Sequence, residues 1–442
     1  MRLTGASGLS VSTFDGKKLL LVMMILAAVL TVESSIGYIA DFIPEQLASG
    51  EGIATFVAIF AIFVVTQYYI LAFVNFNNKS HNIRARFVHT THKIVTVVQY
   101  TLTGIILLVI LQILTDQQYN TILLHIVISI SYIMWIVMLT LLAKAFFSWY
   151  RSKKNLMILI FALSMIAYVI NGAFGLYYQM DELEKKNSVI SLGDIAVFPE
   201  SPSSIDMVYQ LASSVSYVLT WIATVMLLRP YIEKFGRVRF WTMMGAPMIY
   251  YLIEFPLFSL GLFTPSEDSN AIINILIFTL APIFAGILFG VAFLSIARTL
   301  KMGTAARNYM IIAAYGFVLF YIAGSASTSQ AAYPPYGLIS VSFTGLSCYL
   351  IYNGLYFSAV SISQDMNLRQ SIKKSVMEQS KLLHSIGTAE MENEVQKQIL
   401  IAASKTSESM SDKTGIEPSM DEDDIKDYIQ LVIKEIDKKP NL

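Results

Sequence analysis

The chain has few cysteines, few charges and none of the short motifs that mark common enzymes. Its only cysteine is Cys348, so no disulfide forms within the chain and no Cys-x-x-Cys metal site exists. Only 14% of its 442 residues are charged, against about a quarter in soluble domains. There is no P-loop, HExxH or GxSxG pattern, so we expect no enzyme, no metal ion and no cofactor. A net charge of zero gives no reason to expect nucleic acid as a partner.

Long apolar runs dominate the chain instead. Hydrophobic residues make up 55% of it, and a membrane-spanning helix needs roughly 20 mostly apolar residues. The runs predict an all-α, polytopic helical membrane protein with about ten transmembrane helices and no strands. The expected spans are residues 18–40, 53–77, 94–115, 120–147, 155–178, 206–229, 239–263, 271–298, 307–326 and 336–361. The first run has no signal-peptide cleavage pattern, so we interpret it as a retained span.

Basic residues gather in alternate connections, which predicts the orientation of the chain. The basic stretches are the N-terminal arm and the connections 78–93, 144–154, 229–239 and 298–307. The connections between them hold only Lys185 and Lys186 and are otherwise rich in acids. Basic loops stay on the cytoplasmic side of a membrane. We therefore expect a multi-pass protein of the cell membrane with both termini in the cytoplasm.

Four polar side chains inside the expected spans are candidates for ligand binding. A carboxylate in hydrocarbon is costly and usually functional. Glu33 and Glu254 each follow the basic residue that opens their span by 15 residues, which places both roughly 22 Å from the cytoplasmic edge. His125 and Asn171 fall at a similar height. These four side chains predict an outward-facing polar pocket for a solute or a proton, and the alternative is hydrogen bonding that holds the bundle together.

Prolines and glycines in the second half of the chain predict interrupted and closely packed helices. Pro247 and Pro256 lie in the seventh expected span, and Pro282 lies in the eighth. A proline removes a backbone donor, and such helix breaks often form transporter sites. The corresponding spans of the first half contain no proline, which disfavours a symmetric carrier. Gly286 and Gly290 form a GxxxG pair that lets a neighbouring helix approach.

The remaining histidines give weaker signals. His81, His89 and His92 lie beside basic residues in one cytoplasmic connection, where we expect contact with lipid headgroups. His384 lies in the expected cytoplasmic tail, but no acid follows it directly and the tail is too short for an ATP-binding domain. We therefore do not expect it to be a phosphoacceptor.

The tail after the last span is expected to have three parts. An N-terminal arm (1–17) and the transmembrane domain (18–361) precede an emergent cytoplasmic helix (362–402), a flexible polar linker (403–420) and an amphipathic docking helix (421–439). The apolar face of the last helix consists of Ile425, Tyr428, Ile429, Val432, Ile433 and Ile436. Acids at its start and lysines at its end suit the helix dipole.

Residues from about 270 to 400 resemble a group of multi-pass membrane proteins of ammonia-oxidising archaea. The segments that carry the resemblance include APIFAGILFGVAFLSIAR, RNYMIIAAYGFVLF and AAYPPYGLISVSFTGLSCYLIYNGLYFSAVSISQD. The group is uncharacterised, so the resemblance implies an archaeal membrane protein and no site residues. An acid often occupies the place of His384 in that group, which further disfavours phosphotransfer.

Taken with the tail, the spans favour a membrane-embedded sensor or signalling scaffold. The outward-facing polar pocket would be coupled to the cytoplasmic helical tail, whose last helix would bind a cytosolic protein in a groove. A pure carrier has little use for a long, patterned tail. The alternative is a secondary transporter or channel for a small polar or cationic solute. The expected partners are the lipid bilayer and the cytosolic protein. A second copy of the chain, in a homo-oligomer, is a further candidate partner.

Overall fold

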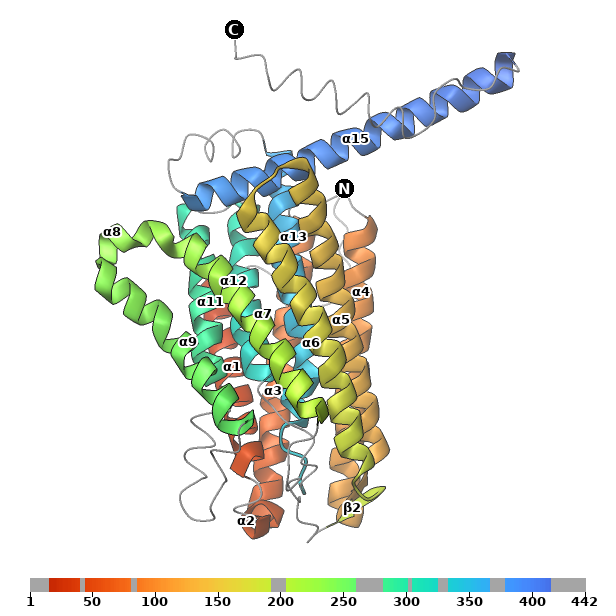
Figure 1. Ribbon diagram of the computed structural model, residues 1–442. Coiled ribbons are helices and arrows are strands. Elements are labelled where there is room, and N and C mark those ends of the chain that lie inside the picture. The colour runs from red at the N-terminus through yellow and green to blue at the C-terminus, as the bar shows by residue number, and fades with distance from the viewer. Residues whose placement is uncertain are drawn as a thin grey trace.

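The computed structural model is a bundle of long helices with one further helix across its end (Figure 1). It describes residues 16–39, 44–80, 86–191, 204–259, 281–300, 304–324, 333–365 and 378–414. The elements are α1 (Gly16–Ile39), α2 (Pro44–Ala48), α3 (Gly50–Ser80), α4 (Arg86–Asp116), β1 (Gln118–Asn120), α5 (Thr121–Ser152), α6 (Leu156–Glu184), β2 (Val189–Ser191), α7 (Ser204–Leu228), η1 (Arg229–Tyr231), α8 (Ile232–Phe235), α9 (Arg237–Ser259), α11 (Ala281–Thr299), α12 (Ala305–Gly324), α13 (Leu338–Gln364) and α15 (Glu378–Thr414).

Nine helices in the described part of the chain are long and apolar enough to cross a membrane. They correspond to nine of the ten expected spans and confirm the all-α, polytopic fold. The remaining expected span, 239–263, forms α9 as far as Ser259. The side chains of 249–259 and the whole of 260–263 lie outside the described residues.

The described connections gather at two opposite ends of the bundle (Figure 1). One end carries the α5–α6 and α7–α9 connections with Lys153 and Arg229, and the last turn of α11 with Arg298. We call this the basic end. The other, which we call the acidic end, carries α2 and the strands, with Glu51 and Asp116 beside them. This separation matches the charge pattern of the sequence, and the assignment of the basic end to the cytoplasm stays a prediction.

Helix α13 lies in the centre of the bundle. All its residues from Leu338 to Leu355 are buried. It packs most extensively against α12 and α5, and it also contacts α1, α4 and α15. A helix that is buried on all sides has no lipid-facing stripe. Its many serines and tyrosines therefore have to find hydrogen-bond partners inside the protein.

Glycines set the close packing of α11, α12 and α13. A Cβ on Gly286 would lie 2.8 Å from the Cβ of Tyr321, and one on Gly290 would lie 2.6 Å from Val318 Cγ2. These contacts confirm that the GxxxG pair admits a neighbouring helix, which is α12. On the other face of α12, Gly354 of α13 lies against the backbone nitrogen of Ala313. Small residues thus bring three consecutive helices into backbone contact.

The expectation that the chain has no strands is wrong in one place. β1 and β2 pair antiparallel at the acidic end, with Tyr119 opposite Ile190. Each strand has only three residues, which is too short for an alternating pattern to be recognised. Their pairing gives the exposed backbone between α4 and α5 hydrogen-bond partners.

The expected helix breaks at prolines also need correction. α9 continues through both Pro247 and Pro256, so neither residue ends the helix. A proline inside a helix removes one hydrogen bond and bends the helix, and neighbouring contacts can hold the rest in place. Pro282 is the second residue of α11, where its missing N–H interrupts no bond within the described helix.

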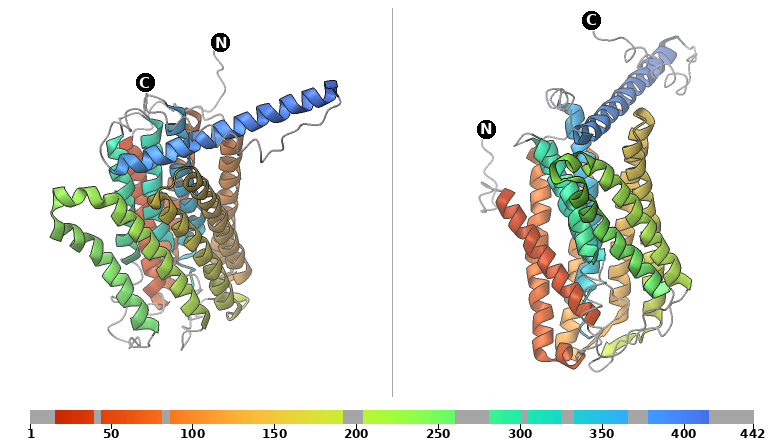
Figure 2. Two further views of the ribbon diagram at one scale, coloured as in Figure 1. Left: turned by 45° about the horizontal axis from the view of Figure 1, so that its top comes forward. Right: turned by 60° about the vertical axis from the view of Figure 1, so that its left-hand side comes forward.

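The tail differs from the continuous emergent helix that we expected. α13 ends at Gln364 and Asp365 has an extended backbone, with φ −102° and ψ 100°. α15 then lies across the basic end and projects beyond the bundle (Figures 1 and 2). It continues to Thr414, through the first part of the expected linker, because no glycine or proline occurs between 388 and 414. The expected docking helix at 421–439 lies outside the described residues.

We predict that Gly354→Ala destabilises the protein by about 1–3 kcal/mol, because the added methyl group forces α12 and α13 apart. The measurement is thermal unfolding of the detergent-solubilised full chain. Gly104→Ala is the matched control, since no atom lies within 4 Å of a Cβ built there. Equal unfolding temperatures for the two variants would contradict the packing argument.

Candidate functional site

Glu33 of α1 is fully buried and lies at the first turn of α13. Its carboxylate accepts hydrogen bonds from the N–H groups of Ile339 (3.2 Å) and Ser340 (3.1 Å), and also from the N–H of Gly337 and the hydroxyl of Ser340. The first N–H groups of a helix have no partner within the helix. Gly337, the residue before α13, has no side chain to cap them. A carboxylate from another helix therefore caps α13 and complements its dipole.

The backbone between α12 and α13 is shaped for this close approach. Gly337 has φ 101°, a left-handed conformation that favours glycine. On α1, one turn beyond Glu33, a Cβ on Gly37 would lie 3.2 Å from the carbonyl oxygen of Tyr336. Tyr336 in turn donates its hydroxyl to the carbonyl oxygen of Gly52, at 2.8 Å. The start of α13 is thus fixed by α1 and α3 together.

The structure does not join the predicted pocket residues by hydrogen bonds within the described part of the chain. All the bonds of Glu33 go to residues 337–340. The ring Nδ1 of His125 lies 3.2 Å from the carbonyl oxygen of Thr121, on its own helix. Asn171 is buried on α6, and its Oδ1 has no hydrogen-bond partner. The side chain of Glu254 lies outside the described residues, so its meeting with Glu33 stays a prediction.

A second polar group lies further along α13, between α3 and α4. The amide of Gln99, which is fully buried, donates to Gln67 Oε1 and to the carbonyl oxygen of Ser342, both at 3.2 Å. Gln67 donates to the hydroxyl of Thr103 at 3.0 Å. Three helices are thereby connected by side-chain amides at mid-height.

A third polar group lies closer to the basic end. The hydroxyl of Tyr349 lies 3.0 Å from His92 Nδ1 and accepts a hydrogen bond from Asn353 at 3.3 Å. Tyr309 of α12 donates to Asn78 Oδ1 at 3.1 Å. His92 is buried, so the expected headgroup contact is wrong for this residue, whereas His89 is exposed and His81 lies outside the described residues.

We call the second and third groups together the polar column. Asn77, next to Asn78 on α3, accepts a hydrogen bond from Asn308 of α12 at 3.3 Å and belongs to it as well. The column consists of Gln67, Asn77, Asn78, His92, Gln99, Tyr309, Tyr349 and Asn353. Along α13 it extends from Ser342 to Asn353, about 16 Å at 1.5 Å per residue. Four of its buried atoms form no hydrogen bond: Asn77 Nδ2, Asn78 Nδ2, Gln99 Oε1 and Asn353 Oδ1. Leaving such an atom unsatisfied costs roughly 1–3 kcal/mol, which marks the column as a candidate site for a polar ligand.

At the basic end, the first half of α15 is held by polar contacts with the end of α5, which we call the clamp. Trp149 Nε1 donates to Glu390 Oε2 at 2.7 Å. Lys153 Nζ lies 2.8 Å from Glu392 Oε1, and the hydroxyl of Ser152 bonds the same carboxylate. These contacts join residues that lie some 240 positions apart in the sequence.

Apolar packing completes the docking of α15. Leu383, Ile386 and Ala389 are buried on its inner face. Gly387 lies directly against the side chain of Ile362, near the end of α13. α15 is therefore in contact with both α13 and α5 at this end of the bundle.

The charge state of Glu390 affects this docking. Burial raises the pKa of its carboxyl above 4.5, while the hydrogen bond from Trp149 opposes the shift. The docked state therefore favours the protonated form. The contribution of Glu390 to docking is fully present below the pKa of a free glutamate and is lost as the pH rises through its raised pKa.

Neutral amides form most of the polar column, whereas the residues that we singled out in the sequence were mainly charged groups within spans. Gln67, Gln99 and Asn353 each stand inside an apolar run, and this was the signal that could have located the column. The clamp was not detectable, because nothing in the sequence pairs Trp149 with Glu390. Their meeting depends on the return of the chain after α13.

No model of a known protein family matches the chain, and no curated protein or solved structure matches it. The resemblance over about 270–400 therefore stays a prediction. The function of the chain has to be inferred from the geometry of α13, the polar column and α15.

We predict that Glu33→Gln lowers the stability of the folded bundle by roughly 2–5 kcal/mol, because an amide offers one acceptor oxygen where the carboxylate offers two. Chemical or thermal unfolding of the full chain in detergent measures this loss. The control is Glu51→Gln, an exposed position in the first turn of α3. A Glu33→Gln protein as stable as the control would show that the cap is not needed.

Proposed function

We propose that the protein is a membrane-embedded sensor or signalling scaffold in which α13 carries a signal to α15. The observation that carries this proposal is the position of α15. It is docked at the last turns of the same helix whose first turn is capped by Glu33. One buried helix therefore carries part of the candidate input, the polar column, along its length and contacts the candidate output, α15, at its end.

The enclosure of α13 supports this role. Tyr349 and Asn353 connect it to the polar column, while Ile362 touches α15. Interiors are close-packed, so a shift of one side of a helix moves its neighbours. Binding of a polar solute among the unsatisfied amides would change the hydrogen bonds of Tyr349 and Asn353. That change would alter the surface on which α15 rests.

The outer half of α15 supports an output role. Val395, Ile399 and Ile401 of α15 are exposed. The same helix projects beyond the bundle (Figures 1 and 2). We propose that a cytosolic protein binds there and at the amphipathic segment 421–439, with the basic end in the cytoplasm. The basic connections at this end support that orientation.

A second candidate function is favoured by the polar column itself. Four unsatisfied buried atoms between α3, α4 and α13 suit the passage of a small polar or cationic solute as well as its detection. A potential-sensitive dye in proteoliposomes with a potassium gradient would report flux. Flux that Asn78→Leu and Asn353→Leu abolish would favour a transporter or channel over a sensor.

We predict that Tyr349→Phe loosens α15 although the two do not share a hydrogen bond. The measurement is hydrogen exchange of the full chain in nanodiscs, followed in peptides covering 382–393. Loss of one interior hydrogen bond is worth about 1 kcal/mol, so exchange there should rise about fivefold. Tyr100→Phe, an exposed position on α4, is the matched control and should leave exchange unchanged.

The clamp supplies a positive control for the same experiment. Glu392→Lys places two cations together and should release α15, and Lys153→Glu in the same chain should restore its protection. If Glu392→Lys raises hydrogen exchange in α15 but Tyr349→Phe does not, the proposed coupling is contradicted, because docking of α15 would then be independent of the polar column.

A further inference from the structure

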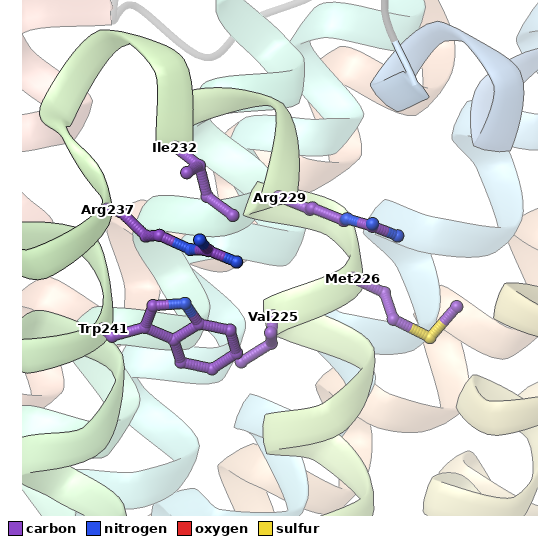
Figure 3. Close-up of a pocket in the computed structure, with 6 residues that line it drawn as sticks. All are labelled: Val225, Met226, Arg229, Ile232, Arg237 and Trp241. Carbon is purple, nitrogen blue, oxygen red and sulfur yellow. The ribbon is translucent and has the colours of Figure 1, made fainter.

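A pocket lies outside the polar column and the clamp, between α7 and the η1–α8–α9 segment. Its volume is about 330 Å³. Six residues line it, which are Val225, Met226, Arg229, Ile232, Arg237 and Trp241. In Figure 3 the side chains of Ile232, Arg237 and Trp241 face Val225 across the gap, whereas those of Arg229 and Met226 extend away from it. Four of the six are apolar or aromatic, and the other two are arginines.

The pocket lies where membrane-spanning structure ends. The apolar span of α7 ends at Leu228, directly before Arg229. Arg237 is the first residue of α9. Trp241 lies one turn later on the same helix, and its side chain is 46% exposed. Arginine and tryptophan together are typical of the level at which acyl chains meet headgroups. The arginines are therefore at headgroup height, and the apolar lining continues toward the acyl chains.

The walls of the pocket are held in place without a ligand. Trp221 Nε1 donates to the carbonyl oxygen of Met244 at 2.8 Å, which ties α7 to α9 about one turn below the pocket. At the top, Gly236 has φ 83° and reverses the chain between α8 and α9. A residue with a side chain would be strained there. The pocket is thus part of the fold.

Of the two arginines, Arg237 faces the pocket and is available for an anion. Within the described residues, neither Arg229 nor Arg237 forms an ion pair, and both are exposed. A guanidinium offers a planar set of donors that matches a phosphate group. In Figure 3, Arg237 extends into the gap between α9 and α7, above the ring of Trp241. An anion bound there would contact an apolar wall on its inner side.

We propose that this pocket binds an anionic phospholipid, with the phosphate at Arg237 and acyl carbons against Val225, Ile232 and Trp241. Free phosphate would gain nothing from the apolar lining, and a neutral headgroup would leave the guanidinium of Arg237 without an anion. Basic pockets between helices at this level of a membrane bind acidic headgroups. The site is independent of the proposed function, since a sensor and a carrier can both hold a lipid here.

The test is native mass spectrometry of the delipidated full chain titrated with phosphatidylglycerol or phosphatidylcholine. Phosphatidylglycerol should bind more tightly. Arg237→Gln should weaken its binding about fivefold, since a basic residue near a membrane surface contributes roughly 1 kcal/mol. Arg237→Lys should keep most of the affinity. Arg239→Gln, an exposed neighbour on α9 that does not line the pocket, should behave as the unmodified protein.

Several results would overturn the proposal. Equal binding of the two lipids would exclude recognition of the anionic headgroup. Unchanged phosphatidylglycerol binding in a folded Arg237→Gln variant would place the lipid elsewhere. Inorganic phosphate that displaces the lipid at millimolar concentration would identify an anion site without a lipid preference. Unfolding temperatures measured without lipid show whether each variant is folded, and Arg237→Lys serves as the test if a glutamine variant is not.

Discussion

The carboxylate of Glu33 at the first turn of α13 is the constraint on which the rest of the structure depends. A helix that begins inside the protein exposes N–H groups that water cannot reach. Gly337 turns the chain into the helix but brings no capping side chain. α1 therefore has to carry an acceptor at this depth and to approach closely, which Gly37 permits. A costly intramembrane acid is thus explained by the helix it caps.

Enclosure of α13 has consequences along its whole length. With no face toward lipid, its polar groups find their partners inside the protein. Asn353 donates to Tyr349 on α13 itself, the hydroxyl of Tyr349 meets His92 of α4, and the carbonyl oxygen of Ser342 accepts from Gln99 of α4. At its last turns α13 meets α15, which Trp149 holds through Glu390. The polar interior and the docked tail helix are therefore two parts of one arrangement centred on α13.

The amino-acid sequence predicts the bundle well because its signals are local. Nine expected spans are helices, and Gly286 and Gly290 admit a neighbour as expected. The candidate site was harder to predict, since depth along a helix does not determine which helix is adjacent. Glu33 was a candidate for ligand binding, with hydrogen bonding inside the bundle as the alternative, and its hydrogen bonds cap α13. The end of α13 at Gln364 depends on how the following chain packs, and the partners of Trp149 depend on tertiary contact alone.

The central claim is that α13 links the Glu33 cap to α15. Pulsed electron–electron double resonance, which measures the distance between two spin labels, tests it directly. The labels are attached at Thr101→Cys on α4 and Val395→Cys on α15, in a Cys348→Ser background in nanodiscs. We predict a narrow distance distribution in the otherwise unmodified protein and a broader, shifted one when Glu33→Gln is added. Superimposable distributions from two folded proteins would contradict the link.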